Sequence, residues 1–114
     1  MPVPNGTVTM APTALIGIIS RTAQDVQGVA RMGAVPPSRV GQVLTGSHTR
    51  EGVLVRVQEG SVSADVYLIA ENEAQLLEIG ERVQAAIAHA IREMVGMDVR
   101  EVNVYIQDVE AGRG

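Results

Sequence analysis

One long amphipathic helix constrains the fold more than any other feature of this sequence. Between Asn72 and Gly96, large apolar residues recur at steps of three and four, the period of one helical face: Leu76, Ile79, Val83, Ile87, Ala90, Ile91 and Met94. Asn72 and Gln75 have the spacing of an N-terminal capping pair, and Gly96 stands where a left-handed residue ends many helices. A helix with one apolar stripe must bury it, so the flanking segments have to supply a sheet.

The flanking segments alternate apolar and polar residues, as half-buried strands do. Val53–Val57 and Val62–Ala70 enclose Glu59-Gly60, a turn signal that predicts a β-hairpin. Val99–Val109 alternates in the same way and predicts the last strand. Thr7–Met10 has the pattern of a short first strand.

A second amphipathic helix is predicted to open at Pro12, because proline is tolerated in a first turn, and to end at Gly28. The resulting order β-α-β-β-α-β predicts an α+β two-layer sandwich in which both helices cover one face of a four-stranded sheet, in a ferredoxin-like arrangement. With 114 residues and 46% hydrophobic content, residues 1–114 are expected to form a single domain. The ends 1–5 and 111–114 are expected to be flexible, and the Pro- and Gly-rich segment 33–52 is predicted to be a loop.

The composition argues against most classes of enzyme and of nucleic-acid binder. The chain has no cysteine for thiolate chemistry and no lysine for a phosphate-binding loop. His48 and His89 have no ligand partners at a metal-binding spacing, so we expect no metal, no cofactor and no catalytic residue. A net charge of -4 without a basic patch disfavours nucleic acid. The longest apolar run, Ala14–Ile19, falls short of the ~20 residues of a membrane span, and no signal peptide precedes it, so we expect a cytoplasmic protein without direct membrane insertion.

The sheet face turned away from the helices is predicted to carry both tyrosines of the chain. Strand alternation places seven residues on it: Leu54, Arg56, Asp65, Tyr67, Ile69, Asn103 and Tyr105. Arg56 and Asp65 are expected to form a cross-strand ion pair there. Because tyrosine combines a large apolar ring with a polar tip, we interpret this face as a protein-contact surface, for a second copy or for another protein. An ordinary solvated sheet face fits the same residues equally well.

Three segments, taken in order, resemble a known bacterial family. They are the opening Gly6–Pro12, the hairpin Gly52–Ile69 and the closing stretch Gly96–Gln107. Together they resemble the alkaline shock protein family of envelope-stress proteins, over nearly the whole chain from Gly6 to Val109.

The resemblance implies a non-enzymatic cytoplasmic protein linked to cell-envelope homeostasis. Some members of that family are held near the membrane by a separate membrane protein, and the family supplies no catalytic residues to transfer. We therefore predict an adaptor or scaffold that acts through protein contacts, forms homo-oligomers and meets a membrane-anchored envelope protein. The alternative is a small-molecule-sensing regulatory domain that uses the loop 33–52 as a lid.

Overall fold

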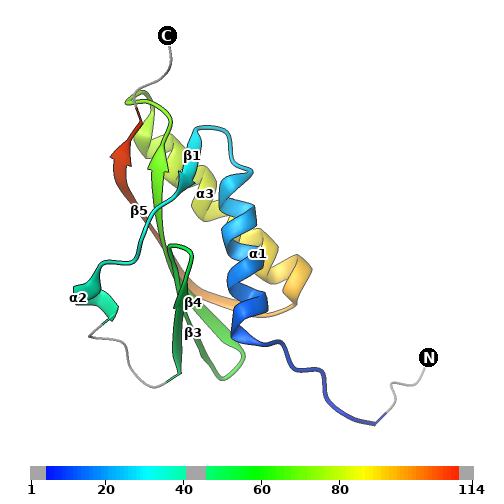
Figure 1. Cartoon of the computed structure of the whole chain (residues 1–114). Helices are drawn as coiled ribbons and strands as arrows, with labels where there is room; N and C mark the ends of the chain where they lie inside the picture. Colours follow the sequence, from blue (N-terminus) through cyan, green and yellow to red (C-terminus); the bar gives the residue numbers. More distant parts are fainter. Residues whose placement is uncertain (1–4, 41–45, 111–114) are drawn as a thin grey trace.

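Two helices lie on one face of a mixed sheet, as expected for an α+β two-layer sandwich (Figure 1). The computed structural model describes residues 5–40 and 46–110. Within these ranges, the helices and strands are α1 (Pro12–Gln24), β1 (Val29–Met32), α2 (Pro37–Val40), β2 (Ser47–Arg50), β3 (Val53–Gln58), β4 (Ser61–Ala70), α3 (Leu76–Ala90), the π-helical turn η1 (Ile91–Val95) and β5 (Asp98–Val109).

Strand β4 is the centre of the sheet, which has five strands in the described part of the chain. Along one side, β4 pairs with the parallel strand β5 over its full length. Along the other side, its first half pairs with antiparallel β3 and its last three residues with antiparallel β1. Strand β2 extends the sheet beyond β3. Because β4 and β5 pair directly, the sheet has the ferredoxin-like hairpin, helix and parallel strand without a leading strand between them.

The predicted first strand, Thr7–Met10, is wrong. Residues 5–11 run as an extended arm that projects from the domain (Figure 1), and the Val8 side chain is fully exposed. The physical reason lies in the topology, since the position that a leading strand takes in the ferredoxin-like order is closed by the β4–β5 pairing.

Within the segment 33–52, the short helical turn that Ser38–Leu44 suggests is present in part as α2, whereas strand β2 was not predicted; residues 41–45 lie outside the described part. Strand β2 turns into β3 through Glu51 and Gly52, whose φ angles are 51° and 76°. The predicted hairpin turn at Glu59 and Gly60 is confirmed, with φ angles of 51° and 78°. Positive φ at both central residues is the signature of a type I′ turn, whose twist matches that of the paired strands.

The stripe of the long helix forms the centre of the core, as predicted. Its buried members, in α3 and the start of η1, pack against α1 and the valines of the sheet: Ile79, Val83, Ile87 and Ile91. Met94 is an exception, with 71% of its surface exposed. The helix has by then passed into the π-helical turn, which shifts the phase of the stripe.

Of the two capping predictions for the long helix, the one for its C-terminal end is confirmed and the one for its N-terminal end is wrong. Gly96 ends η1 with a φ of 79°, as predicted. Asn72 does not cap the helix, because α3 begins only at Leu76. Its side-chain oxygen instead accepts a hydrogen bond from the Ala74 N–H, 2.9 Å away, in the preceding turn.

Candidate functional site

The site begins where β4 changes its antiparallel partner, at Tyr67. Val66 is the last residue of β4 in register with β3, and Leu68 is the first that follows in register with β1. Between them, the Tyr67 N–H donates to the Gly52 carbonyl, and the Tyr67 carbonyl accepts from the Gly33 N–H, both at 2.8 Å. The two shorter strands therefore meet end to end beside one residue of β4.

This meeting requires glycine. A Cβ at Gly52 would lie 2.7 Å from the Gly33 carbonyl oxygen and 2.9 Å from that of Tyr67, both closer than atoms pack. The φ of +76° at Gly52 is also a conformation that other residues rarely adopt. After Gly33 the chain leaves the sheet.

Residues 34–39, here called the strap, then cross the sheet face that α1 and α3 leave uncovered (Figure 1). Gln107 of β5 fixes the start of the strap, because its amide accepts from the Ala34 N–H at 3.0 Å and donates to the Ala34 carbonyl at 2.7 Å. Arg39 of α2 fixes the other end by an ion pair with Asp65 of β4.

Asp65 is a buried carboxylate with a partner for each oxygen. Arg39 binds Oδ2, and the Asn103 side-chain amide donates to Oδ1 at 2.9 Å. The charge of Asp65 raises the pKa of the Arg39 guanidinium, a group that is already protonated at ordinary pH. A buried charge is tolerated when it is paired and hydrogen-bonded in this way.

The predicted ion pair between Arg56 and Asp65 is wrong. The β3–β4 register sets Asp65 opposite Leu54 and sets Arg56 opposite Ser63. Arg56 instead donates to the Gln58 side chain at 3.0 Å. Arg39, which belongs to the segment predicted to be a loop, binds Asp65 in its place.

Tyr67 and Tyr105 lie opposite each other on β4 and β5 and stack face to face. Their ring centroids are 4.7 Å apart and the ring planes differ by 12°. Tyr67 is 4% exposed whereas Tyr105 is 41% exposed, so a buried ring supports a ring that reaches solvent. Burial of the phenol raises the pKa of Tyr105, and the nearby charge of Asp65 raises it further.

The structure brings together four of the seven predicted contact residues and adds Arg39 to them. We call this group the tyrosine face: Arg39, Asp65, Tyr67, Asn103 and Tyr105. Leu54 and Ile69 are buried, and Arg56 is half-buried at the margin. Tyr105 is thus the predicted residue most open to a partner.

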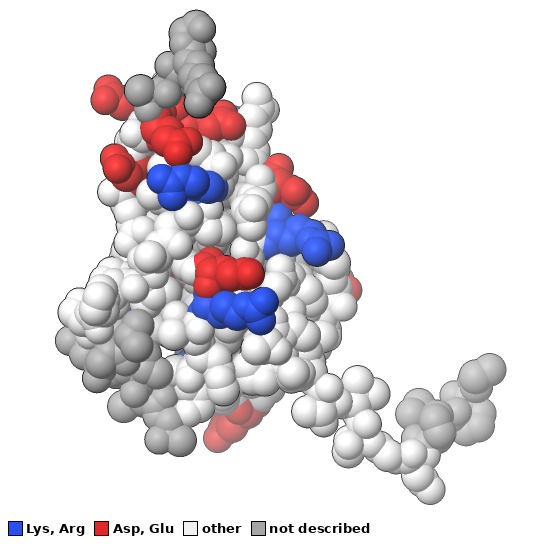
Figure 2. Space-filling view, viewed as in Figure 1, with Lys and Arg blue, Asp and Glu red and all other residues white. Residues whose placement is uncertain are grey.

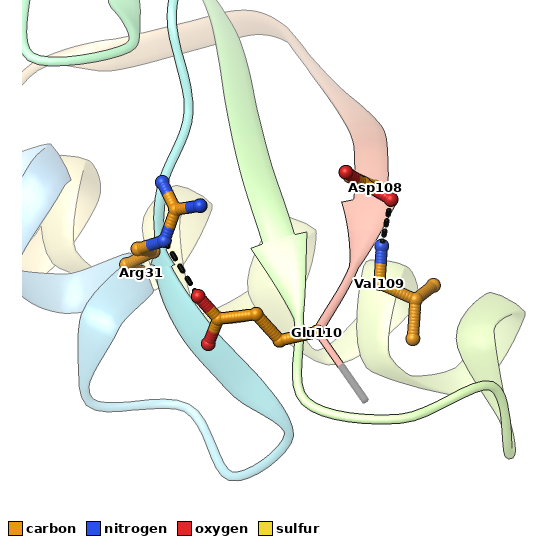
Figure 3. A network of polar contacts seen from close by, with 4 residues as sticks. All are labelled: Arg31, Asp108, Val109 and Glu110. Atoms are coloured by element: carbon orange, nitrogen blue, oxygen red, sulfur yellow. Dashed lines mark hydrogen bonds and ion pairs between the residues drawn. The ribbon is translucent and has the colours of Figure 1, made fainter. Parts of the chain in front are cut away.

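Other polar groups of the described chain show ordinary surface chemistry. Figure 3 shows Arg31 of β1 bound to Glu110, 2.8 Å away, an exposed pair of the kind that contributes little to stability. Arginines lie beside acidic residues on the face seen in Figure 2 and do not gather into one basic patch. His48 and His89 are exposed, and residues 5–40 and 46–110 contain no group of three potential metal ligands. No helix in these ranges is long and apolar enough to cross a membrane.

The fold is similar to that of the C-terminal domain of MamM. The copper form of that domain superimposes with a TM-score of 0.61 at 21% identity, over 90% of this chain and 91% of the other. A second structure of the domain, covering residues 215–293, gives a TM-score of 0.54 at 22% identity, over 87% of this chain and 96% of the other. This likeness defines the class, an α+β domain of ferredoxin-like type.

The chain belongs to the alkaline shock protein 23 family, because the model of this family matches residues 2–111. The family is described as having a cell envelope-related function. Among its relatives are two uncharacterized proteins of Bacillus subtilis. YloU is 23% identical over 91% of this chain and 88% of its own length, and YqhY is 27% identical over 92% and 78%. Spy1614 of Streptococcus pyogenes is 19% identical over 93% of this chain and 89% of its own length. The resemblance to the alkaline shock protein family is therefore confirmed.

Proposed function

We propose that this protein is a non-enzymatic adaptor that binds another protein of the cell envelope through its tyrosine face. The family is described by a cell envelope-related function and not by a reaction. This description supports a non-enzymatic role at the cell envelope. The adaptor acts in the cytoplasm and comes close to the membrane through a membrane-anchored partner.

The stacking of Tyr105 on Tyr67 is the observation that carries this proposal. Aromatic side chains anchor many protein interfaces, since they bury a large area and still offer a polar tip. An exposed side chain normally loses rotamer freedom when a partner binds. Tyr105 is already held at 4.7 Å from a buried ring, so its binding position is preorganised and that cost is reduced.

The polar part of the tyrosine face favours a binding role. Asp65 uses its two oxygens for Arg39 and Asn103: the contact with Arg39 holds the strap against the sheet, and the contact with Asn103 links β4 to β5. Arg39 and Asn103 are half-buried and belong to the same face as Tyr105, so polar side chains accompany the exposed ring as they do in the rim of an interface.

A matched pair of variants tests the proposal. Tyr105→Ser removes the ring from the tyrosine face, and Met94→Ser removes an exposed apolar side chain of η1. Wild type and both variants are used as bait with solubilised envelope fractions, and captured proteins are identified by quantitative mass spectrometry. We expect the captured envelope protein to be lost with Tyr105→Ser and retained with Met94→Ser. The same captured set from all three baits would overturn the assignment of this face.

A second candidate function is small-molecule sensing, with the segment 33–52 as a lid. One observation favours it: the Nε of Arg39 is buried and has no hydrogen-bond acceptor among the described residues. A ligand with a carboxylate or carbonyl oxygen would supply the acceptor. In a thermal-shift screen of metabolites, a saturable shift in wild type that disappears in Arg39→Gln would support sensing. Shifts of equal size in both proteins would place the ligand elsewhere.

A further inference from the structure

The outer edge of β5 is unpaired within the described residues, because β5 pairs with β4 alone. Exposed edges are normally protected by bulges and charges. Strand β5 has both, but only near its ends: its register shifts between Val99 and Glu101 and again between Ile106 and Asp108. The stretch 102–107 between the charged ends carries no charge. It is the part of the edge that remains open to another strand.

An apolar groove runs beside this stretch, between β5 and the first turns of α3. It has a volume of about 310 Å³, and its lining includes Leu77 from the helix and Val104 and Ile106 from the strand. Leu77 is 78% exposed, although it is a large apolar residue. The lining also includes Glu81 and Gln84, and the Gln84 amide donates to the Val102 carbonyl at 2.8 Å, so an added strand would compete with Gln84 for that one acceptor.

The arm, residues 5–11, has the complementary properties. It is extended, it carries no charge, and it alternates Thr7, Val8, Thr9 and Met10 in the pattern of a half-buried strand. Val8 and Met10, which such a strand would place on its buried face, are instead exposed. Within the described residues, the arm therefore has the pattern of a strand but pairs with no other strand, and the outer edge of β5 has no partner.

We propose that the arm of a second copy of this chain adds as a strand to the free edge of β5 at residues 102–107. In either strand direction, the two-residue period puts Val8 and Met10 together on one face. On the helix side of β5 they close the groove at Leu77, while Thr7 and Thr9 lie on the side of Tyr105. Reciprocal exchange of arms gives a closed two-fold dimer. This assembly is separate from the proposed envelope contact.

The second copy is a better occupant than the arm of the same chain. Helix α1, which follows the arm, packs over β1, β2 and β3, whereas α3 packs over β5. The arm leaves α1 in a direction away from the domain (Figure 1). To reach the outer edge of its own β5, the arm would have to turn back and pass the α3 layer.

Light scattering across a concentration series tests the exchange of arms, with variants of the arm and of the groove. The double variant Val8→Asp/Met10→Asp disables the arm, and Leu77→Asp disables the groove. Met94→Asp is the matched control, because Met94 is an exposed apolar residue that lies away from this groove. We expect wild type and the control to be dimers, and each disabled variant to dimerise at least about tenfold more weakly, with unchanged circular dichroism.

Mixing the two disabled variants provides the sharpest test. One retains an intact groove and the other an intact arm, so a mixed pair recovers one of the two arm–groove contacts. We expect the mixture to form dimers at concentrations where each variant alone is a monomer. A monomeric wild type, disabled variants that dimerise as wild type does, or a mixture that stays monomeric would each overturn the proposal. So would a monomer whose amides at 102–107 are protected by its own arm in hydrogen exchange.

Discussion

The ring of Tyr105 lies nearly parallel to the ring of Tyr67, with centroids 4.7 Å apart, because the parallel register of β4 and β5 sets the two residues side by side. The two tyrosines have the same chemistry and opposite environments, one buried and one open to solvent. This difference separates their contributions to stability and to binding.

Truncation of the two rings is expected to have unequal effects on folding. Tyr67→Ala removes a buried ring and should cost about 3–5 kcal/mol in the free energy of unfolding. Tyr105→Ala mainly removes a stacking contact and should cost about 1 kcal/mol. Urea denaturation of both variants measures the difference. Equal losses would contradict the difference in burial between the two rings.

Tyr105 should also make the folded state sensitive to alkali. In the unfolded chain a tyrosine loses its proton near pH 10, whereas burial and Asp65 raise the pKa of Tyr105 in the folded state. Above about pH 10 the folded state therefore binds more protons than the unfolded state, and stability must fall as the pH rises. Tyr105→Phe should reduce this slope and leave stability at pH 7 almost unchanged. Denaturation curves between about pH 7 and pH 11 test it, and an identical slope in the variant would contradict it.

The ion pair between Arg39 and Asp65 should show coupling in a double-mutant cycle. Arg39→Gln leaves a buried carboxylate with only Asn103 as partner and should cost about 1–2 kcal/mol, less than for a fully buried pair because the Arg39 side chain is 42% exposed. Asp65→Asn in the Arg39→Gln background should cost less than it does alone. Purely additive losses in urea denaturation would show that the two charges do not act together.

Two hairpin glycines provide a matched comparison of space and backbone strain. Gly60→Ala meets no atom within 4 Å, so only the positive φ of 78° opposes it, at a cost of about 1 kcal/mol. Gly52→Ala has a similar φ of 76° and in addition brings its Cβ against two carbonyl oxygens. We expect it to cost about 1–3 kcal/mol more. If both variants melt at the same temperature, the approach of β1 to β3 is looser than the structure shows.

Long periodic segments were predictable from the sequence, and short ones were not. The stripe Ile79–Ile91, the turn at Glu59 and Gly60, and strand β5 each have several residues that agree on one period. Strand β1 has four residues, and strand β2 is the polar tetrapeptide Ser47–Arg50, so neither shows a clear alternation. Strand β2 did leave a signal, because Glu51-Gly52 repeats the dipeptide of the correctly predicted turn.

The strand residues of the candidate site were predictable from the sequence, but the strap that contributes Arg39 was not. Alternation along β4 and β5 correctly joined Asp65, Tyr67, Asn103 and Tyr105. A charge in the middle of an apolar strand also required a cation nearby, and Arg56 was the one on the adjacent strand. Arg39 is 26 positions from Asp65 and belongs to a short helix after a Pro-Pro pair, where no periodic pattern fixes the path of the chain.

On the side away from β5, the change of partner at Tyr67 gives the two halves of β4 different neighbours. Residues 61–66 pair there with β3 through a tight hairpin, while residues 68–70 pair with the short strand β1. Detachment of the segment 29–39 would break its pairing with residues 68–70 and its contacts to Gln107 and Asp65, but would leave the pairing of β3, β4 and β5 intact. Such sub-global opening costs less than unfolding the domain. Such an opening would leave Tyr105 in place beside Tyr67, because it would not break the β4–β5 pairing.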